Sequence, residues 1–191
     1  SGEIVGLAGI AGNGQSELLD ALAGLLVPQA GTLVVGERRF TPAHWLAPDV
    51  ARDLGIAHVP EDRQKRGLVL PFPAWESAVR VDCNAMMERF DVRPRQCDLR
   101  SGKFSGGNQQ KLVLAREAAP EPRILLVGQP TRGVDIGAIE FIHERLRAMR
   151  DGGSTVLLVS SELDEILALS DRVLVMNAGR IVGELPIEQC S

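Results

Sequence analysis

Short runs of β-branched and other apolar residues alternate along this chain with segments in which apolar residues recur every three or four positions. The apolar runs fall at residues 4–8, 33–35, 56–59, 124–127 and 155–159. Uninterrupted runs of this length are typical of strands that are buried on both faces of a parallel sheet. Strands that alternate with helices therefore predict an α/β fold with a parallel sheet.

Helical periodicity is clearest between the last two of these runs. A single apolar stripe is formed there by Ile139, Ile142, Leu146 and Met149. A second helix is expected over residues 16–25, directly after a glycine-rich turn. Near the carboxyl end, two apolar runs flank residues 177–179, whose Asn-Ala-Gly sequence is typical of a hairpin turn. Gly36 indicates a further hairpin after the run at 33–35.

Residues 71–102 interrupt the alternation of strands and helices. This stretch is helical in parts, most clearly at residues 85–90, and it predicts a helical subdomain inserted into a single domain that spans residues 1–191. Phe72, Trp75 and Phe90 are large apolar residues in a segment with little room to bury them. Since exposed apolar groups commonly mark interaction sites, we expect a docking surface here.

The composition is that of a globular domain. Of 191 residues, 45% are hydrophobic and 24% are charged, which suffices for a core without disulfides or metals. The net charge of -4 gives no reason to expect a nucleic-acid partner, and no apolar run approaches the roughly 18 residues of a membrane span. Cys83, Cys97 and Cys190 lack the spacing of a zinc site and are expected to be free thiols in a reducing cytoplasm.

A glycine-rich loop follows the first predicted strand. Its sequence GIAGNGQSE has the frame of a phosphate-binding P-loop, G-x-x-x-x-G-K-[ST], with glutamine in place of lysine. Backbone N–H groups of such a loop converge on phosphate oxygens at a helix N-terminus. The candidate nucleotide-binding residues are Gly9, Gly12, Asn13, Gly14, Gln15, Ser16 and Glu17. Gln15 lacks the charge of lysine and Glu17 adds a negative one, so a turn without ligand is the alternative for this loop taken alone.

A second anion-binding pattern lies at residues 105–111, which read SGGNQQK and lead into a helical segment. Ser105 offers a hydroxyl, and Gly106 and Gly107 expose backbone N–H groups at a helix N-terminus. A helix merely capped by Ser105 is the alternative. The stretch, including Asn108 and Gln109, resembles the LSGGQ signature of ATP-binding cassettes.

Other segments resemble the remaining motifs of that family, in its order. The sequence VPED resembles the Q-loop, with Glu61 in place of glutamine. The apolar run at 124–127 resembles the Walker B strand, with Gly128 where the magnesium-binding aspartate belongs and Gln129 where the catalytic glutamate belongs. Asp135 keeps the carboxylate of the D-loop, and Ser161 stands where the switch histidine belongs.

The resemblance implies the fold of a P-loop, RecA-like NTPase of the ATP-binding cassette type. It is closest to the second, degenerate cassette of importers for simple sugars or nucleosides, and the run DIGAIEFIH at 135–143 favours the nucleoside branch. Two features depart from the family. In the family, the aromatic residue that stacks on adenine lies upstream of the P-loop, and this sequence begins too late to show it. The interval from Glu61 to Ser105 is also shorter than the family's usual helical subdomain.

The same resemblance implies the ligands and the activity. ATP and Mg²⁺ are the expected cofactors, with Ser16 as the obvious protein ligand of the metal, although binding at this copy's own site is doubtful. Substitutions at Gln15, Gly128, Gln129 and Ser161 predict that the isolated domain is inactive.

The partners also follow from the resemblance. In this family two cassettes pack head to tail, so the signature would complete the ATP site of a second cassette, expected in the same polypeptide. Transmembrane permease subunits, a substrate-binding protein and a peripheral position on the cytoplasmic face of the membrane are implied as well. A scaffold or regulatory cassette without nucleotide contact is the alternative, and a DNA-repair ATPase is disfavoured because extended heptads are absent.

Overall fold

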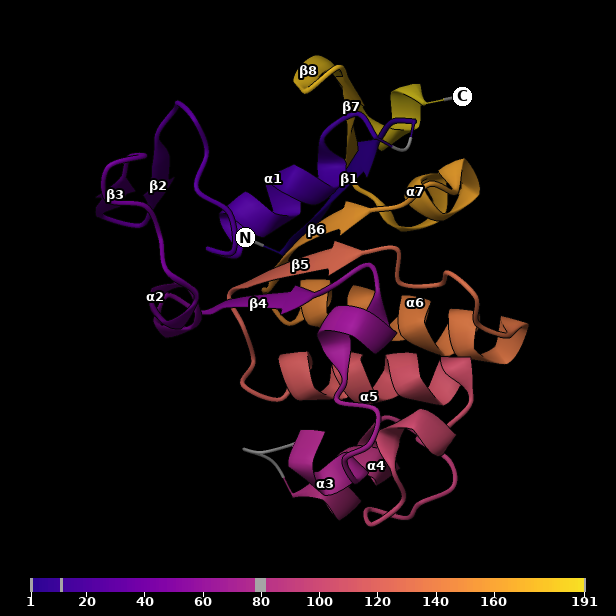
Figure 1. Cartoon of the computed structure of the whole chain (residues 1–191). Helices are drawn as coiled ribbons and strands as arrows, with labels where there is room; N and C mark the ends of the chain where they lie inside the picture. Colours follow the sequence, from indigo (N-terminus) through magenta and orange to yellow (C-terminus); the bar gives the residue numbers. More distant parts are fainter. Residues whose placement is uncertain (1, 11, 78–81, 191) are drawn as a thin grey trace.

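The computed structural model describes residues 2–10, 12–77 and 82–190 and has a six-stranded sheet at its centre (Figure 1). The strand order is β4-β5-β6-β1-β7-β8; neighbours from β4 to β7 are parallel, and β8 is antiparallel to β7. The strands are β1 Glu3–Ala8, β4 Ile56–Val59, β5 Ile124–Gly128, β6 Thr155–Val159, β7 Arg172–Asn177 and β8 Arg180–Pro186. The predicted α/β fold with a parallel sheet is confirmed.

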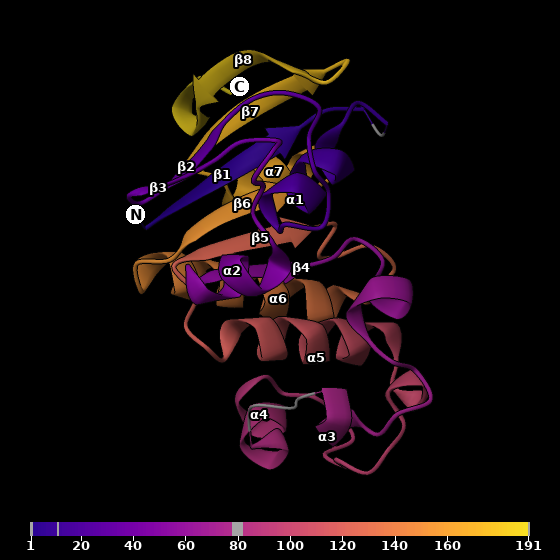
Figure 2. The ribbon, with the colours of Figure 1, turned by 60° about the vertical axis from the view of Figure 1, so that its left-hand side comes forward.

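Helices cover both faces of this sheet, giving three layers (Figures 1 and 2). One face packs against α5 (Gly106–Ala118), α6 (Ile136–Asp151) and α7 (Leu163–Leu169). The other packs against α1 (Gln15–Leu22) and α2 (Pro48–Asp53), together with the small hairpin of β2 (Leu33–Val35) and β3 (Arg38–Phe40). Short turns complete the chain: a π-helical turn η1 (Arg63–Gly67) and 3₁₀ turns η2 (Ser101–Lys103) and η3 (Ile187–Gln189).

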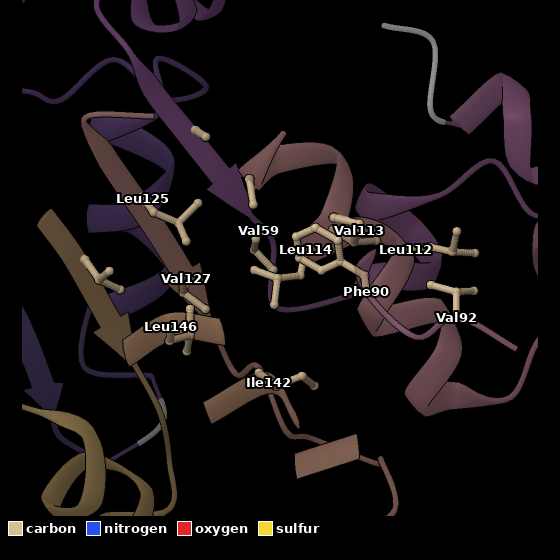
Figure 3. Packing of buried hydrophobic residues seen from close by; sticks show 14 of the residues in the cluster. Val59, Phe90, Val92, Leu112, Val113, Leu114, Leu125, Val127, Ile142 and Leu146 are labelled. Carbon is tan, nitrogen blue, oxygen red and sulfur yellow. The ribbon is translucent and has the colours of Figure 1, made fainter. Parts of the chain in front are cut away.

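The central strands divide their side chains between the two layers. In β5, Leu125 and Val127 enter the core with Leu146 of α6, as Figure 3 shows. Leu126, between them in sequence, packs in the opposite core with Leu19 of α1. This alternation follows from the two-residue period of a strand, and it explains why the run reads as continuously apolar.

The inserted segment forms a layer beneath α5 (Figure 2), with helices α3 (Ala74–Ser77) and α4 (Cys83–Arg89). Phe72 and Trp75 are about half exposed, at 48% and 50%, whereas Phe90 is only 4% exposed. Phe90 meets the ring of Phe141 edge-on, with centroids 6.4 Å apart. The prediction that Phe90 belongs to an exposed surface is wrong, because α5 and α6 provide the apolar surface that buries it.

Two predicted boundaries can be compared directly. α1 ends at Leu22, not at residue 25, because Gly24 takes a left-handed backbone with φ +77°. The hairpin at 177–179 is confirmed, with φ of 47° at Ala178 and 74° at Gly179. Left-handed backbone at both central residues suits the twist of a two-residue hairpin.

Cysteine and membrane expectations can also be checked within the described stretches. Cys83, Cys97 and Cys190 are all free thiols. No helix among the described residues combines the length and the apolar character that a membrane span requires.

Candidate nucleotide-binding site

The loops that follow four parallel strands meet at one edge of the sheet. β1 leads into the glycine-rich loop, β4 into Glu61, β5 into Gln129 and β6 into Ser161. Ligands of open α/β sheets bind outside the carboxyl ends of the strands. The topology therefore gathers the P-loop, Q-loop, Walker B and switch positions that the sequence predicts.

The glycine-rich loop has the backbone of an anion cradle. Gly12 and Gly14 have φ of 88° and 104°, a region that glycine enters without steric cost. α1 begins at Gln15, and Gly14, its N-cap, supplies no side-chain cap. The first N–H groups of α1 are therefore available to an anion.

Gln15 is turned inward, against the loop. Its side chain is 6% exposed, and its Nε2 donates to the carbonyl of Ile10 at 3.2 Å. A Cβ on Gly9 would lie only 2.5 Å from this Nε2, so Gly9 is what lets the amide fit. Gln15 supports the shape of the loop and brings no charge to a phosphate.

Asn13 fastens the loop to the turn between β7 and β8. Its Nδ2 donates to Ile10 at 3.0 Å, and its Oδ1 accepts from the backbone N–H of Ala178 at 2.8 Å. The N–H of Gly179 donates to the carbonyl of Asn13 at 2.8 Å. The P-loop is thus held from both its strand side and the hairpin.

Glu61 occupies the space that a side chain at position 128 would need. A Cβ on Gly128 would lie 2.5 Å from Cγ of Glu61. The Glu61 carboxylate accepts a hydrogen bond from Ser16 Oγ at 2.9 Å. The sequence suggested Ser16 as the only obvious metal ligand, but the structure adds a carboxylate beside it.

A hydroxyl and a carboxylate at this spacing fit Mg²⁺, which prefers a few oxygen ligands together with phosphate and water. Among the described residues, no group of three or more His, Cys, Asp or Glu side chains could hold a metal. Ser16 and Glu61 would therefore share such an ion with the ligand's own oxygens.

Gln129 and Ser161 are joined directly. Gln129 has φ of 48°, and its Oε1 accepts from the backbone N–H and the hydroxyl of Ser161, both at 3.0 Å. An amide oxygen cannot take a proton at neutral pH as a carboxylate can. These positions form a neutral hydrogen-bonded pair.

The signature serine begins α5. Ser105 is its N-cap and is exposed, while Gly107 is buried against Asp135 and Ala138, either of which would lie 2.8 Å from a Cβ on it. Asp135 in turn caps α6 by accepting from the N–H of Ala138 at 2.9 Å. The signature and the D-loop are therefore packed together within the domain.

Arg63 joins the Q-loop to the D-loop, and Gln64 joins it to the signature. Sequence reasoning missed both residues. The guanidinium of Arg63 donates to the carbonyls of Arg132 and Gly133 at 2.7 and 3.1 Å. Gln64 Nε2 donates to Gln109 Oε1 at 3.1 Å. The available signal was Asp62 before this basic run, because aspartate commonly caps a helical turn.

Asp62 does cap this turn, since its carboxylate accepts from the N–H groups of Gln64 and Lys65 at 3.1 and 3.0 Å. The hydrogen bond from Lys65 is the main reason that the pKa of Asp62 lies below its ordinary value. The cap fixes the direction in which Arg63 leaves the backbone.

A glycine-rich loop between β1 and α1, at the carboxyl edge of a parallel sheet, defines a P-loop nucleotide-binding domain. Two further features, the order of the other motifs and the presence of the inserted helices, narrow this class to the ATP-binding cassettes. The chain belongs to the ABC transporter family, whose model matches residues 1–132.

Curated relatives are similar over nearly the whole chain. The guanosine import ATP-binding protein NupO of Bacillus subtilis is 41% identical over 97% of this chain, and the glucose import ATP-binding protein TsgD13 of Haloferax volcanii is 42% identical over 96%. The chain spans only 40% and 37% of their respective lengths.

A solved structure shows the same fold. It is a dimeric ATP-binding cassette in a post-hydrolysis state with ADP and phosphate, 22% identical to this chain with a TM-score of 0.79. The match covers 97% of this chain and 86% of that one.

Proposed function

We propose that this domain is a degenerate cassette of an ATP-driven importer, and that its signature completes the ATP site of a second cassette in trans. The observation that carries the proposal is the contrast between two anion sites. Ser105 is exposed at the start of α5, whereas Gln15 and Gln129 direct their side chains to partners within the domain.

The site at the domain's own P-loop lacks the charges that phosphoryl transfer uses. Gln15 is neutral and buried, and Gln129 offers an amide where a general base would act. Loss of general-base help alone costs about 10²–10⁴ in rate. The glycine-rich backbone still suits an anion, whereas the missing lysine at Gln15 and the negative charge of Glu17 disfavour a bound triphosphate.

Exposed apolar residues at the edge of the sheet support a second cassette as partner. Ile10 in the P-loop, Ile136 after the D-loop and Leu163 after the switch serine are 81%, 77% and 60% exposed. Large exposed apolar groups at one edge mark an interaction surface. Relatives of which this chain covers about 40% have room for a further domain of this size.

The inserted subdomain is the proposed contact with transmembrane permease subunits. Phe72 and Trp75 in this segment, and Val69 just before it, are each about half exposed. With such a contact the domain would lie at the cytoplasmic face of the membrane. A substrate-binding protein would deliver the cargo to the permease from the opposite face.

The transported substrate is proposed as a simple sugar or a nucleoside. Identity does not separate the two classes, because the guanosine and glucose relatives are 41% and 42% identical. The run at 135–143 favours the nucleoside branch by resemblance. Uptake of labelled guanosine and of ribose by cells carrying the complete transporter would distinguish them.

The decisive experiment measures ATP hydrolysis and uptake in the complete two-cassette protein. Ser105→Arg should abolish both, because it places a bulky group at the partner's phosphate. Gln15→Ala should leave most of the turnover, since that loop already lacks its charge. Lys103→Ala, at an exposed position on the turn before the signature, is the matched control.

A reversed result, with Gln15→Ala inactive and Ser105→Arg active, would refute the trans role. Gly107→Asp does not isolate this role, because a Cβ on Gly107 would lie 2.8 Å from both Asp135 and Ala138 and would disturb the packing of the signature itself. If the partnered dimer binds nucleotide equally with and without an intact Ser105, the scaffold alternative holds instead.

A further inference from the structure

We propose that Asn108 is a positioning residue that aims the hydroxyl of Ser105 and ties it to the inserted helical subdomain. This inference rests on the trans role of the signature proposed above. In this proposal, the side-chain amide of Asn108 couples the position of the inserted subdomain to the orientation of the Ser105 hydroxyl.

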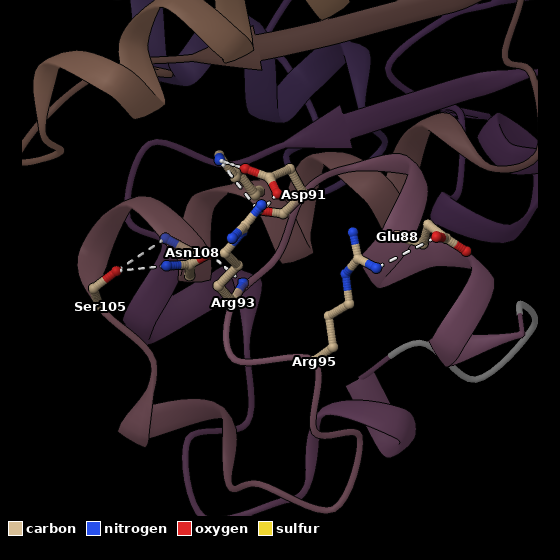
Figure 4. Close-up of polar contacts among 7 residues, drawn as sticks. Glu88, Asp91, Arg93, Arg95, Ser105 and Asn108 are labelled. Carbon is tan, nitrogen blue, oxygen red and sulfur yellow. Dashed lines mark hydrogen bonds and ion pairs between the residues drawn. The ribbon is translucent and has the colours of Figure 1, made fainter.

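The amide of Asn108 bridges two segments, as Figure 4 shows. Its Nδ2 donates to Ser105 Oγ at 2.9 Å, and its Oδ1 accepts from the backbone N–H of Arg93 at 2.6 Å. Oxygen faces a donor and nitrogen faces an acceptor, so both contacts fix the same amide orientation. Arg93 belongs to the inserted segment and Ser105 begins α5.

The hydroxyl of Ser105 is left as a donor. Its oxygen accepts from Asn108 twice, from Nδ2 at 2.9 Å and from the backbone N–H at 3.4 Å. A hydroxyl has two acceptor sites and one proton. With the acceptor sites directed at Asn108, the proton points away from the helix toward solvent, where a phosphate oxygen of a partner-bound nucleotide would accept it.

The other end of the bridge is anchored in the same region. Arg93 Nε is paired with the Asp91 carboxylate at 2.8 Å, and Lys111 of α5 contacts the same carboxylate at 3.3 Å. Lys111 also lies over the ring of Phe141 in α6, at 4.4 Å from its centroid. The segment that carries the Arg93 N–H is therefore held to α5 and α6 and cannot shift without moving this network.

A displacement of the inserted subdomain relative to the start of α5 would strain the Arg93–Asn108 bond together with the Asp91–Lys111 contact. If that bond lengthens, the amide of Asn108 is free to rotate, and Ser105 loses its stronger donor. Docking at Phe72 and Trp75 would in this way set whether the signature serine is aimed at the partner's phosphate.

The bridge can be tested in the isolated chain by hydrogen exchange at the Arg93 amide. In the native protein this amide should be protected, and Asn108→Ala should speed its exchange by about tenfold. Asn108→Asp keeps an oxygen facing Arg93 and should keep the protection. Arg95→Ala, which removes the neighbouring pair with Glu88, is the matched control. Equal exchange in wild type and Asn108→Ala overturns the proposal.

The positioning role is tested in the complete two-cassette protein by a double-mutant cycle. Asn108→Ala should lower kcat/KM for ATP by about five- to tenfold, the loss of one hydrogen bond. Combined with Ser105→Ala, it should add nothing, because Asn108 acts through that hydroxyl. If the losses of kcat/KM from the two substitutions multiply, the positioning role of Asn108 is overturned and the trans role still stands. If Ser105→Arg leaves ATP hydrolysis unchanged, the trans role itself is refuted.

Discussion

The side-chain oxygen of Gln129 accepts two hydrogen bonds from Ser161, one from its backbone N–H and one from its hydroxyl, both 3.0 Å long. The motif resemblance matches these residues to the family's general base and switch histidine. Neither an amide nor a hydroxyl changes protonation near neutral pH. The Gln129 side chain is hydrogen-bonded within the domain, and neither of these two side chains can act as a general base near neutral pH.

Restoring the base alone should not restore hydrolysis. We expect the isolated chain and its Gln129→Glu variant both to stay well below about 1 s⁻¹ with MgATP, because Gln15 remains neutral and position 128 has no carboxylate. Phosphate release under steady-state conditions is the measurement. Turnover at or above that rate by either isolated protein contradicts the assignment of this site as degenerate.

A methyl group at position 128 should destabilise the fold. Gly128→Ala places a Cβ 2.5 Å from Glu61 Cγ, and overpacking of this kind costs about 1–3 kcal/mol. Urea unfolding gives the change, and adding Glu61→Ala should recover most of it. Gly137→Ala in α6, with no atom closer than 3.6 Å to the new Cβ, is the control and should be neutral or stabilising. A Gly128→Ala protein as stable as wild type would show that Glu61 does not fill this space.

Removal of the Arg63 guanidinium should loosen the D-loop. Arg63→Ala deletes its hydrogen bonds to Arg132 and Gly133, a loss of about 1–3 kcal/mol in unfolding free energy for a charged donor. Hydrogen exchange across residues 129–135 should accelerate along with it. Lys65→Ala, on the same turn but 83% exposed, should change neither quantity appreciably. Unchanged exchange in Arg63→Ala would show that the Arg63 hydrogen bonds do not hold the D-loop in place.

Cys83 should resist alkylation in the folded protein. Burial, with a contribution from Cys97, raises the pKa of the Cys83 thiol to about 12. A raised pKa keeps the proton on sulfur, so at pH 8 only about one thiol in 10⁴ is ionised, and reactivity grows only as the pH approaches 12. Iodoacetamide labelling followed by mass spectrometry should modify Cys190 first and Cys83 only after unfolding. Rapid native labelling of Cys83 at pH 8 contradicts this environment.

The fold could be predicted from sequence because its signals are local. Alternating apolar runs and the order of short motifs depend on neighbours along the chain. Hairpins such as the one at Ala178 and Gly179 are indicated by residue types that favour turns. Even so, α1 ended earlier than its apolar residues indicate, because the left-handed backbone at Gly24 overrides the pattern.

The contacts that shape the site could not be predicted, because their partners are distant in sequence. Glu61 reads as a substituted Q-loop residue, and Gly128 as a lost aspartate, until the end of β4 places one against the other. Phe90 looked exposed for the same reason, since its cover comes from Phe141. Motif reading identifies each substitution, but only packing shows which substitutions belong together.

The contact between Glu61 and Gly128 also makes the residue types tolerated at these two positions depend on each other. An aspartate at position 128 would bring its Cβ to 2.5 Å from Glu61 Cγ, so this substitution alone should be destabilising. A smaller residue at position 61, or a different Glu61 rotamer, would relieve the overlap. A carboxylate at position 128 and the present side chain at position 61 therefore compete for one volume, and a variant that gains the first must change the second.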